Sequence, residues 1–174
     1  MLRLACLIPL MFAPLAAFGQ GAEVPFGGLS HDASLPVEIT ADALELDQAA
    51  GTAVFIGTVQ VGQGELRMAA DRIEVFYAGE EIGAAGASTG AVQRMLAIGN
   101  VTLSNGAEAA EAERATYEVG SGIVEMDGSV LLTQGRNALS SERLRIDLNA
   151  GTGRLEGRVQ TIFTPGSTPG AAPR

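Results

Sequence analysis

Residues 140–159 read SSERLRIDLNAGTGRLEGRV, and this stretch contains the most characteristic part of a unit that the chain repeats. Glu142 precedes an alternating strand, a Gly-Thr-Gly turn follows at 151–153, and a second strand contains the step Gly157-Arg-Val159. Alternation of apolar and polar residues is typical of a strand with one buried face, and glycine is typical of tight turns. The unit is therefore a strand, a tight turn and a second strand with the Gly-x-Val step, followed by another turn and a third strand that runs into the next unit.

The same unit begins again at Asp42, Asp71 and Glu113. The first two starts are 29 residues apart and so are the last two, whereas the middle pair is 42 apart because a Gly/Ala-rich insertion occupies residues 78–91. A unit this short cannot bury its apolar face alone, but stacked units can share one core. We therefore expect an all-β domain of about four repeats of short antiparallel strands. The Gly-x-Val step keeps its phase throughout, at Gly57-Val59, Gly99-Val101, Gly128-Val130 and Gly157-Val159.

Strand alternation also predicts which side chains face the interior. The set holds no tryptophan, so the core packs lightly for its length and leaves room for a groove between two curved sheets. The predicted inward residues are Leu44, Leu46, Phe55, Val59, Val61, Met68, Ile73, Val75, Leu103, Tyr117, Met126, Val130, Leu132, Leu139, Leu144, Ile146, Leu155 and Val159.

The N-terminus has the pattern of a secretory signal. Arg3 is followed by an uncharged run from Leu4 to Phe18, and small residues stand at Ala17 and Gly19. About 15 apolar residues with two prolines suit a cleaved signal better than a membrane anchor of ~20 residues. We expect a signal peptide over 1–19 and periplasmic export, with a retained anchor as the alternative. Residues 20–35 and 164–174 are expected to be flexible, and 36–163 to form the domain.

Composition excludes several classes of function. The chain has 20 acidic residues, 11 arginines, no lysine and a net charge of −9, which argues against nucleic-acid partners and against docking on anionic membranes. The one cysteine, Cys6, belongs to the predicted signal, so we expect neither disulfides nor thiol chemistry. No cofactor, metal ligand set or catalytic residue is predicted.

Four segments of the repeat carry a family resemblance: 36–47 (PVEITADALELD), 69–77 (AADRIEVFY), 97–103 (AIGNVTL) and 140–148 (SSERLRIDL). They resemble the OstA-like domain of the periplasmic lipopolysaccharide-transport proteins, and within that group the soluble bridge of the LptA type. If the N-terminus were retained as an anchor, the chain would instead resemble the inner-membrane component of the LptC type. The resemblance implies an open β-jellyroll with the shape of a twisted V-shaped trough.

The resemblance also implies a ligand and partners. The interior would bind the acyl chains of lipopolysaccharide, and edge strands would stack end to end against matching β-jellyroll domains of inner-membrane and outer-membrane transport components, or against further copies of the chain. Unpaired strand edges can accept a partner strand of this kind. The residues hypothesised to line the lipid groove are Leu46, Val59, Val61, Val75, Leu103, Val130, Leu132 and Ile146.

Two other classes of function stay open on sequence grounds. A structural or adhesive β-repeat is the first, although a calcium-stabilised one would need clustered acids in its turns. A small β-helix enzyme acting on polysaccharide is the second. The chain has only one histidine, His31, and its carboxylates recur unit by unit, whereas a catalytic pair would break the repeat. We interpret the recurring acids and arginines as solvated pairs of small energetic value.

Overall fold

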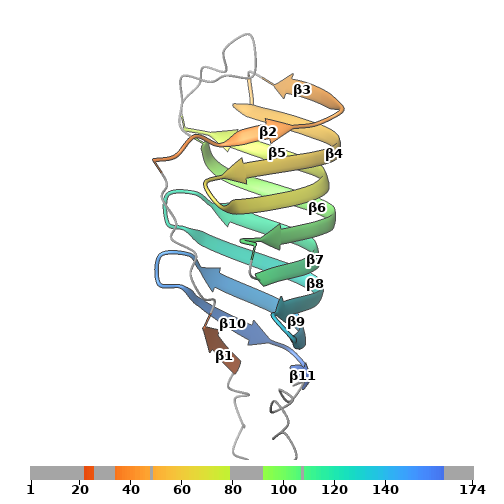
Figure 1. Cartoon of the computed structure of the whole chain (residues 1–174). Helices are drawn as coiled ribbons and strands as arrows, with labels where there is room; N and C mark the ends of the chain where they lie inside the picture. Colours follow the sequence, from red (N-terminus) through yellow and green to blue (C-terminus); the bar gives the residue numbers. More distant parts are fainter. Residues whose placement is uncertain (1–21, 26–33, 48, 79–91, 107, 163–174) are drawn as a thin grey trace, which may run out of the picture.

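The computed structural model describes residues 22–25, 34–47, 49–78, 92–106 and 108–162. These residues form eleven antiparallel strands of one sheet and contain no helix (Figure 1). No helix among them is therefore long and apolar enough to cross a membrane. The strands are β1 (Ala22–Pro25), β2 (Glu38–Thr40), β3 (Ala43–Asp47), β4 (Thr52–Gln63), β5 (Leu66–Tyr77), β6 (Val92–Ser104), β7 (Glu108–Glu118), β8 (Ile123–Gln134), β9 (Asn137–Asp147), β10 (Thr152–Glu156) and β11 (Gln160–Ile162).

Six long strands, β4 to β9, stack in sequence order and make up most of the molecule. Each has 11 to 13 residues, and each bends near its middle where the pairing register shifts. Between β4 and β5, for example, Gly57 and Thr58 together oppose Asp71. Two residues facing one form a β-bulge, which bends a strand and raises its twist. The long strands consequently curve round on the right of the view in Figure 1.

The bends divide the sheet into two walls that share one core. Wall A consists of residues 43–47, 52–56, 72–77, 92–98, 114–118, 123–127, 143–147 and 152–156. Wall B consists of residues 38–40, 59–63, 66–70, 101–104, 108–112, 130–134, 137–141 and 160–162. Buried apolar side chains from both walls form a single cluster. The architecture is the open, folded antiparallel sheet that the repeat predicts.

At both ends of the stack, two short strands take the place of a long one. β2 and β3 pair with the two halves of β4, and β10 and β11 pair with the two halves of β9. β1 then pairs with the outer edge of β10, so it lies beside the C-terminal strands although it precedes β2 in the chain (Figure 1).

The predicted interior is largely confirmed. Of the eighteen inward residues, fourteen are buried, and Phe55 and Val159 are partly buried against the cluster. Leu44 and Leu46 stand opposite the inward residues Phe55 and Ala53 of β4, as predicted, but they are not buried: they are 41% and 39% exposed. They lie on β3, which pairs with β4 on one edge, and no described strand pairs with its other edge.

The N-terminal segment differs in part from its expected form. Within the stretch 20–35 that we expected to be flexible, Ala22–Pro25 forms β1 and Leu35 contacts the domain by accepting a hydrogen bond from Gln63. The predicted signal peptide at 1–19, the tail at 164–174 and nearly all of the insertion at 78–91 lie outside the described residues.

Candidate functional site: the interior between the walls

The bends follow from an acidic residue and a glycine that meet at each corner. Gly57, Gly99, Gly128 and Gly157 all have φ between +77° and +85°, a conformation that glycine adopts without strain. A Cβ added to Gly128 would lie 2.7 Å from the Cβ of Glu113, so no other residue fits there. The corresponding acids at the other three corners are Asp42 at Gly57, Asp71 at Gly99 and Glu142 at Gly157.

The residue after each glycine completes the corner. Thr58, Asn100, Ser129 and Arg158 have φ between +35° and +51°, which is uncommon outside glycine. At three corners the acid holds this residue: Asn100 donates to Asp71 at 2.8 Å, Ser129 to Glu113 at 3.4 Å, and Arg158 to Glu142 at 3.3 Å. The recurring acids therefore fix the bend between the walls, in addition to lying on the solvated outside as expected.

The structure brings seven of the eight hypothesised groove residues into one interior. Val75 and Ile146 come from wall A, and the other five come from wall B. All seven are at most 5% exposed. Leu46, the eighth, points the same way along the repeat but lies uncovered at the end of wall A. The wall B members are Val59, Val61, Leu103, Val130 and Leu132.

A buried hydrogen bond joins the two walls on the side away from the corners. Tyr117 in wall A donates its hydroxyl to Oε1 of Gln63 in wall B at 2.9 Å, and Gln63 Nε2 donates to the carbonyl of Leu35 at 3.2 Å. Both side chains are almost fully buried, and this burial raises the pKa of the Tyr117 phenol well above its ordinary value. Sequence reasoning treated Tyr117 as a plain core residue and missed Gln63, because alternation does not reveal which polar residues face inward.

Among the described residues, the space between the walls beside this hydrogen bond is small. The cavity beside the Tyr117–Gln63 bond measures only about 10 Å³, far too small for a hydrocarbon chain. It is lined by Val61, Gln63, Leu66, Met68, Met95 and Tyr117. The groove residues belong to the same buried apolar cluster as the residues that line this cavity.

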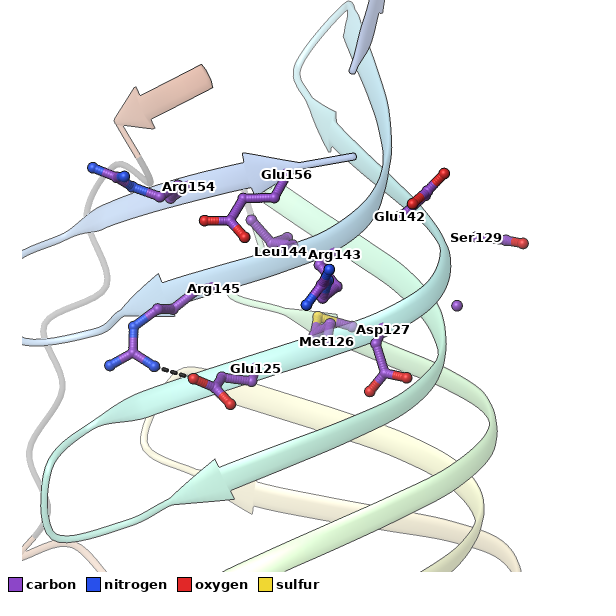
Figure 2. Close-up of a pocket in the computed structure, with 11 residues that line it drawn as sticks. Glu125, Met126, Asp127, Ser129, Glu142, Arg143, Leu144, Arg145, Arg154 and Glu156 are labelled. Carbon is purple, nitrogen blue, oxygen red and sulfur yellow. Dashed lines mark hydrogen bonds and ion pairs between the residues drawn. The ribbon is translucent and has the colours of Figure 1, made fainter. Parts of the chain in front are cut away.

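A shallow pocket on the outer face of wall A has a different chemistry (Figure 2). Arg145 forms an ion pair with Glu125 of the neighbouring strand. Three arginines face four carboxylates here, so the pocket has no excess positive charge to attract an anionic group. These residues are Arg143, Arg145 and Arg154, with Glu125, Asp127, Glu142 and Glu156.

Two observations concern metal-binding and catalytic groups. No group of three potential metal ligands occurs within the described part of the chain. Residues 86–90 read GASTG and fit the letters of a nucleophile elbow, but that elbow needs a strand-to-helix turn. The segment and His31 both lie outside the described residues.

A family model identifies the type of domain. The family model described as LptA/(LptD N-terminal domain) LPS transport protein matches residues 38–152. An uncharacterized protein of Rhizobium meliloti (strain 1021) is 31% identical over 113 residues, which are 64% of this chain and 55% of that protein. The chain thus spans little more than half of that relative's length.

Among solved structures, the fold matches the crystal structure of LptH, the LptA homologous periplasmic component of the lipopolysaccharide transport device from Pseudomonas aeruginosa. The TM-score is 0.66 at 18% identity, over 78% of this chain and 99% of that one. At this identity the match shows the fold, which is that of the expected β-jellyroll.

Proposed function

Because the chain belongs to the LptA/(LptD N-terminal domain) family of LPS transport proteins, we propose that it binds lipopolysaccharide and carries it through the periplasm between the two membranes. The family consists of transport proteins rather than enzymes, which agrees with our expectation of a non-catalytic role. The proposal includes export by the segment 1–19 and contact with inner-membrane and outer-membrane transport components that carry matching β-jellyroll domains.

The observation that carries the proposal is the continuous apolar interior between two walls. Its residues come from every long strand, so the apolar strip runs the length of the stack. Burying a hydrocarbon chain yields about 0.8 kcal/mol per CH₂ group, and the interior offers such a chain aliphatic side chains throughout. The charged sugars and phosphates of the lipid would stay in water at the mouth of the trough.

Bridging rests on the ends of the sheet. β2, β3 and β11 each pair with one neighbouring strand in the described structure, and their residues are almost all exposed. Such edges accept a strand from another domain. A bridge between membranes needs this property at both ends of the domain.

The test is photo-crosslinking in the periplasm. A photoreactive phenylalanine analogue replaces Phe55, which faces the interior and is only partly buried, and in separate variants replaces Leu46. Thr58 and Glu45 are the outward controls, since both are exposed and each lies close in sequence to an inward site. We expect lipopolysaccharide adducts at the inward sites alone. Adducts at none of the four sites in folded, exported protein would reject lipid binding and favour a structural role.

A further inference from the structure

The strand β1 occupies the outer edge of β10 in a defined register. Ala22 stands opposite Leu155, Glu23 opposite Arg154 and Val24 opposite Gly153, in antiparallel orientation. β10 therefore has a neighbour on each side, β9 and β1. The edge that a C-terminal partner would need is, in the single chain, filled by the chain itself.

The repeat shows which strand normally fills this position. Leu155 and Gly153 of β10 correspond to Met126 and Val124 of β8, one unit of 29 residues earlier. Beyond β8 lies β9, with Leu144 opposite Met126 and Ile146 opposite Val124. β1 pairs with the outer edge of β10 as β9 pairs with β8. It therefore occupies the position that the next wall A strand of the repeat would have.

β3 is the wall A strand with that same repeat position at the other end of the molecule. Leu44 and Leu46 follow Asp42 at the spacing by which Leu144 and Ile146 follow Glu142. If β3 of a second copy continued the ladder, its Leu44 would stand opposite Leu155 and its Leu46 opposite Gly153. Those are the positions that Ala22 and Val24 of β1 now hold.

The two strands also share their charge pattern. Glu23 of β1 stands opposite Arg154, and in the continued ladder Glu45 of β3 would stand there too.

β1 is the weaker of the two strands. It has four residues, offers alanine and valine where β3 offers two leucines, and ends in Pro25, which cannot donate a backbone hydrogen bond. A short strand with a proline is also a common means of protecting a sheet edge from unwanted pairing.

We propose that β1 is a displaceable edge strand that imitates β3 of a second copy: it covers the C-terminal edge of the single molecule and leaves when a second copy docks its β3 there. This inference rests on the proposed bridging function and adds a control step to it. Docking would cover Leu44 and Leu46, and it would leave the docked copy's own β1 to protect the far end of the stack.

The first experiment measures docking between copies without lipid. Two full-length single-cysteine proteins, Glu45→Cys and Arg154→Cys, are mixed in a Cys6→Ser background, and disulfide-linked dimers are counted over time under mild oxidation. Arg136→Cys, in the turn before β9, replaces Arg154→Cys in the control mixture. Dimers should form with Arg154→Cys and not with Arg136→Cys.

The decisive comparison adds Glu23→Pro with Val24→Pro to the Arg154→Cys protein. Adjacent prolines remove backbone donors from both edges of β1 and should free the edge of β10. If β1 covers the edge about 90% of the time, its loss lowers the concentration for half-maximal docking about tenfold. An unchanged concentration, or no dimers with either form, would overturn the proposal.

A second variant tests the same idea in the opposite direction. Glu23→Cys with Arg154→Cys in one chain can form a disulfide that fixes β1 on β10. The oxidised protein should stay monomeric in sedimentation velocity at concentrations where the reduced protein associates. Equal association of both forms would refute displacement.

These outcomes are separate from those of the lipid experiment. Docking that responds to β1 without any lipid adducts would reject the proposed function and keep this inference, whereas lipid adducts without any effect of β1 would do the reverse.

Discussion

β3 and β9 hold the same position in the repeat, and yet one is exposed and the other is buried. Leu44 and Leu46 on β3 are 41% and 39% exposed, whereas Leu144 and Ile146 on β9 are 1% and 0% exposed. β9 lies between β8 and β10, while β3 pairs only with β4 in the described structure. The comparison shows that the repeat decides which way a side chain faces, and the number of neighbouring strands decides whether it is buried.

The largest effect should come from truncating the matched leucines at the two positions. Leu144→Ala removes a buried side chain from the middle of the core and should lower the free energy of unfolding by about 3 kcal/mol. Leu44→Ala changes a side chain that is already partly in water and should cost less than about 1 kcal/mol. Urea unfolding of both variants measures the difference, and equal losses would contradict our account of the exposed end.

The corners offer the same comparison with glycine. Gly128→Ala and Gly57→Ala share nearly the same φ, +85° and +80°, so each should lose about 1–2 kcal/mol from the backbone conformation alone. Gly128→Ala should lose more, because Glu113 lies on β7 between two strands, whereas Asp42 precedes the uncovered β3 and can move aside. Thermal unfolding of the two variants tests this order, and equal losses would show that the corner beside β3 is as rigid as the corner in the middle of the stack.

Tyr117 lies midway along the stack and tests how firmly the walls are held together. Tyr117→Phe leaves Oε1 of Gln63 without this donor and should cost about 1–2 kcal/mol, measured by urea unfolding. Leu139→Val, a wall B truncation that leaves the bond intact, is the control for small losses of packing. A Tyr117→Phe protein as stable as the parent would show that the bond does not hold the walls.

The Tyr117 phenol should also make the free energy of unfolding fall at high pH. Burial raises the pKa of Tyr117, so the folded protein keeps a proton that the unfolded chain releases near its ordinary pKa of about 10. The contribution to stability is complete below that pH and declines as the pH rises above it. Urea midpoints at pH 9 and pH 11 should therefore differ less in Tyr117→Phe than in the parent protein. An equal decline in both proteins would assign the pH dependence to another group, for instance Tyr77, because burial also raises the pKa of its phenol.

The smallest effect belongs to the outer face. Glu125→Gln removes the ion pair with Arg145, but both side chains are more than half exposed. Water and salt screen such pairs, so the change in the free energy of unfolding should stay below about 0.5 kcal/mol. A larger loss would mean that the ion pair between Glu125 and Arg145, in the pocket of Figure 2, helps to hold β8 and β9 together.

Much of this fold could be predicted because the sequence repeats it. The Gly-x-Val steps mark all four corners, and alternation identifies most of the core. The exposure of Leu44 and Leu46 could not be predicted, since it depends on the missing neighbour of β3. The pairing of β1 with β10 was equally hidden, because four residues far from the C-terminus carry no signal of their partner. The link between Tyr117 and Gln63 joins positions 54 residues apart on different walls, and single-strand patterns contain no information about it.

The direction of the backbone hydrogen bonds has a mechanical consequence. In every strand pair they run along the stack, within wall A or within wall B, and the corner glycines lie along the line where the walls meet. Tension along the long axis is therefore shared by whole ladders, whereas a rotation of one wall about the corner line leaves those ladders intact and is resisted by the corners and by side-chain contacts between the walls. The molecule is therefore stiffer along the stack than it is against a change in the angle between its two walls.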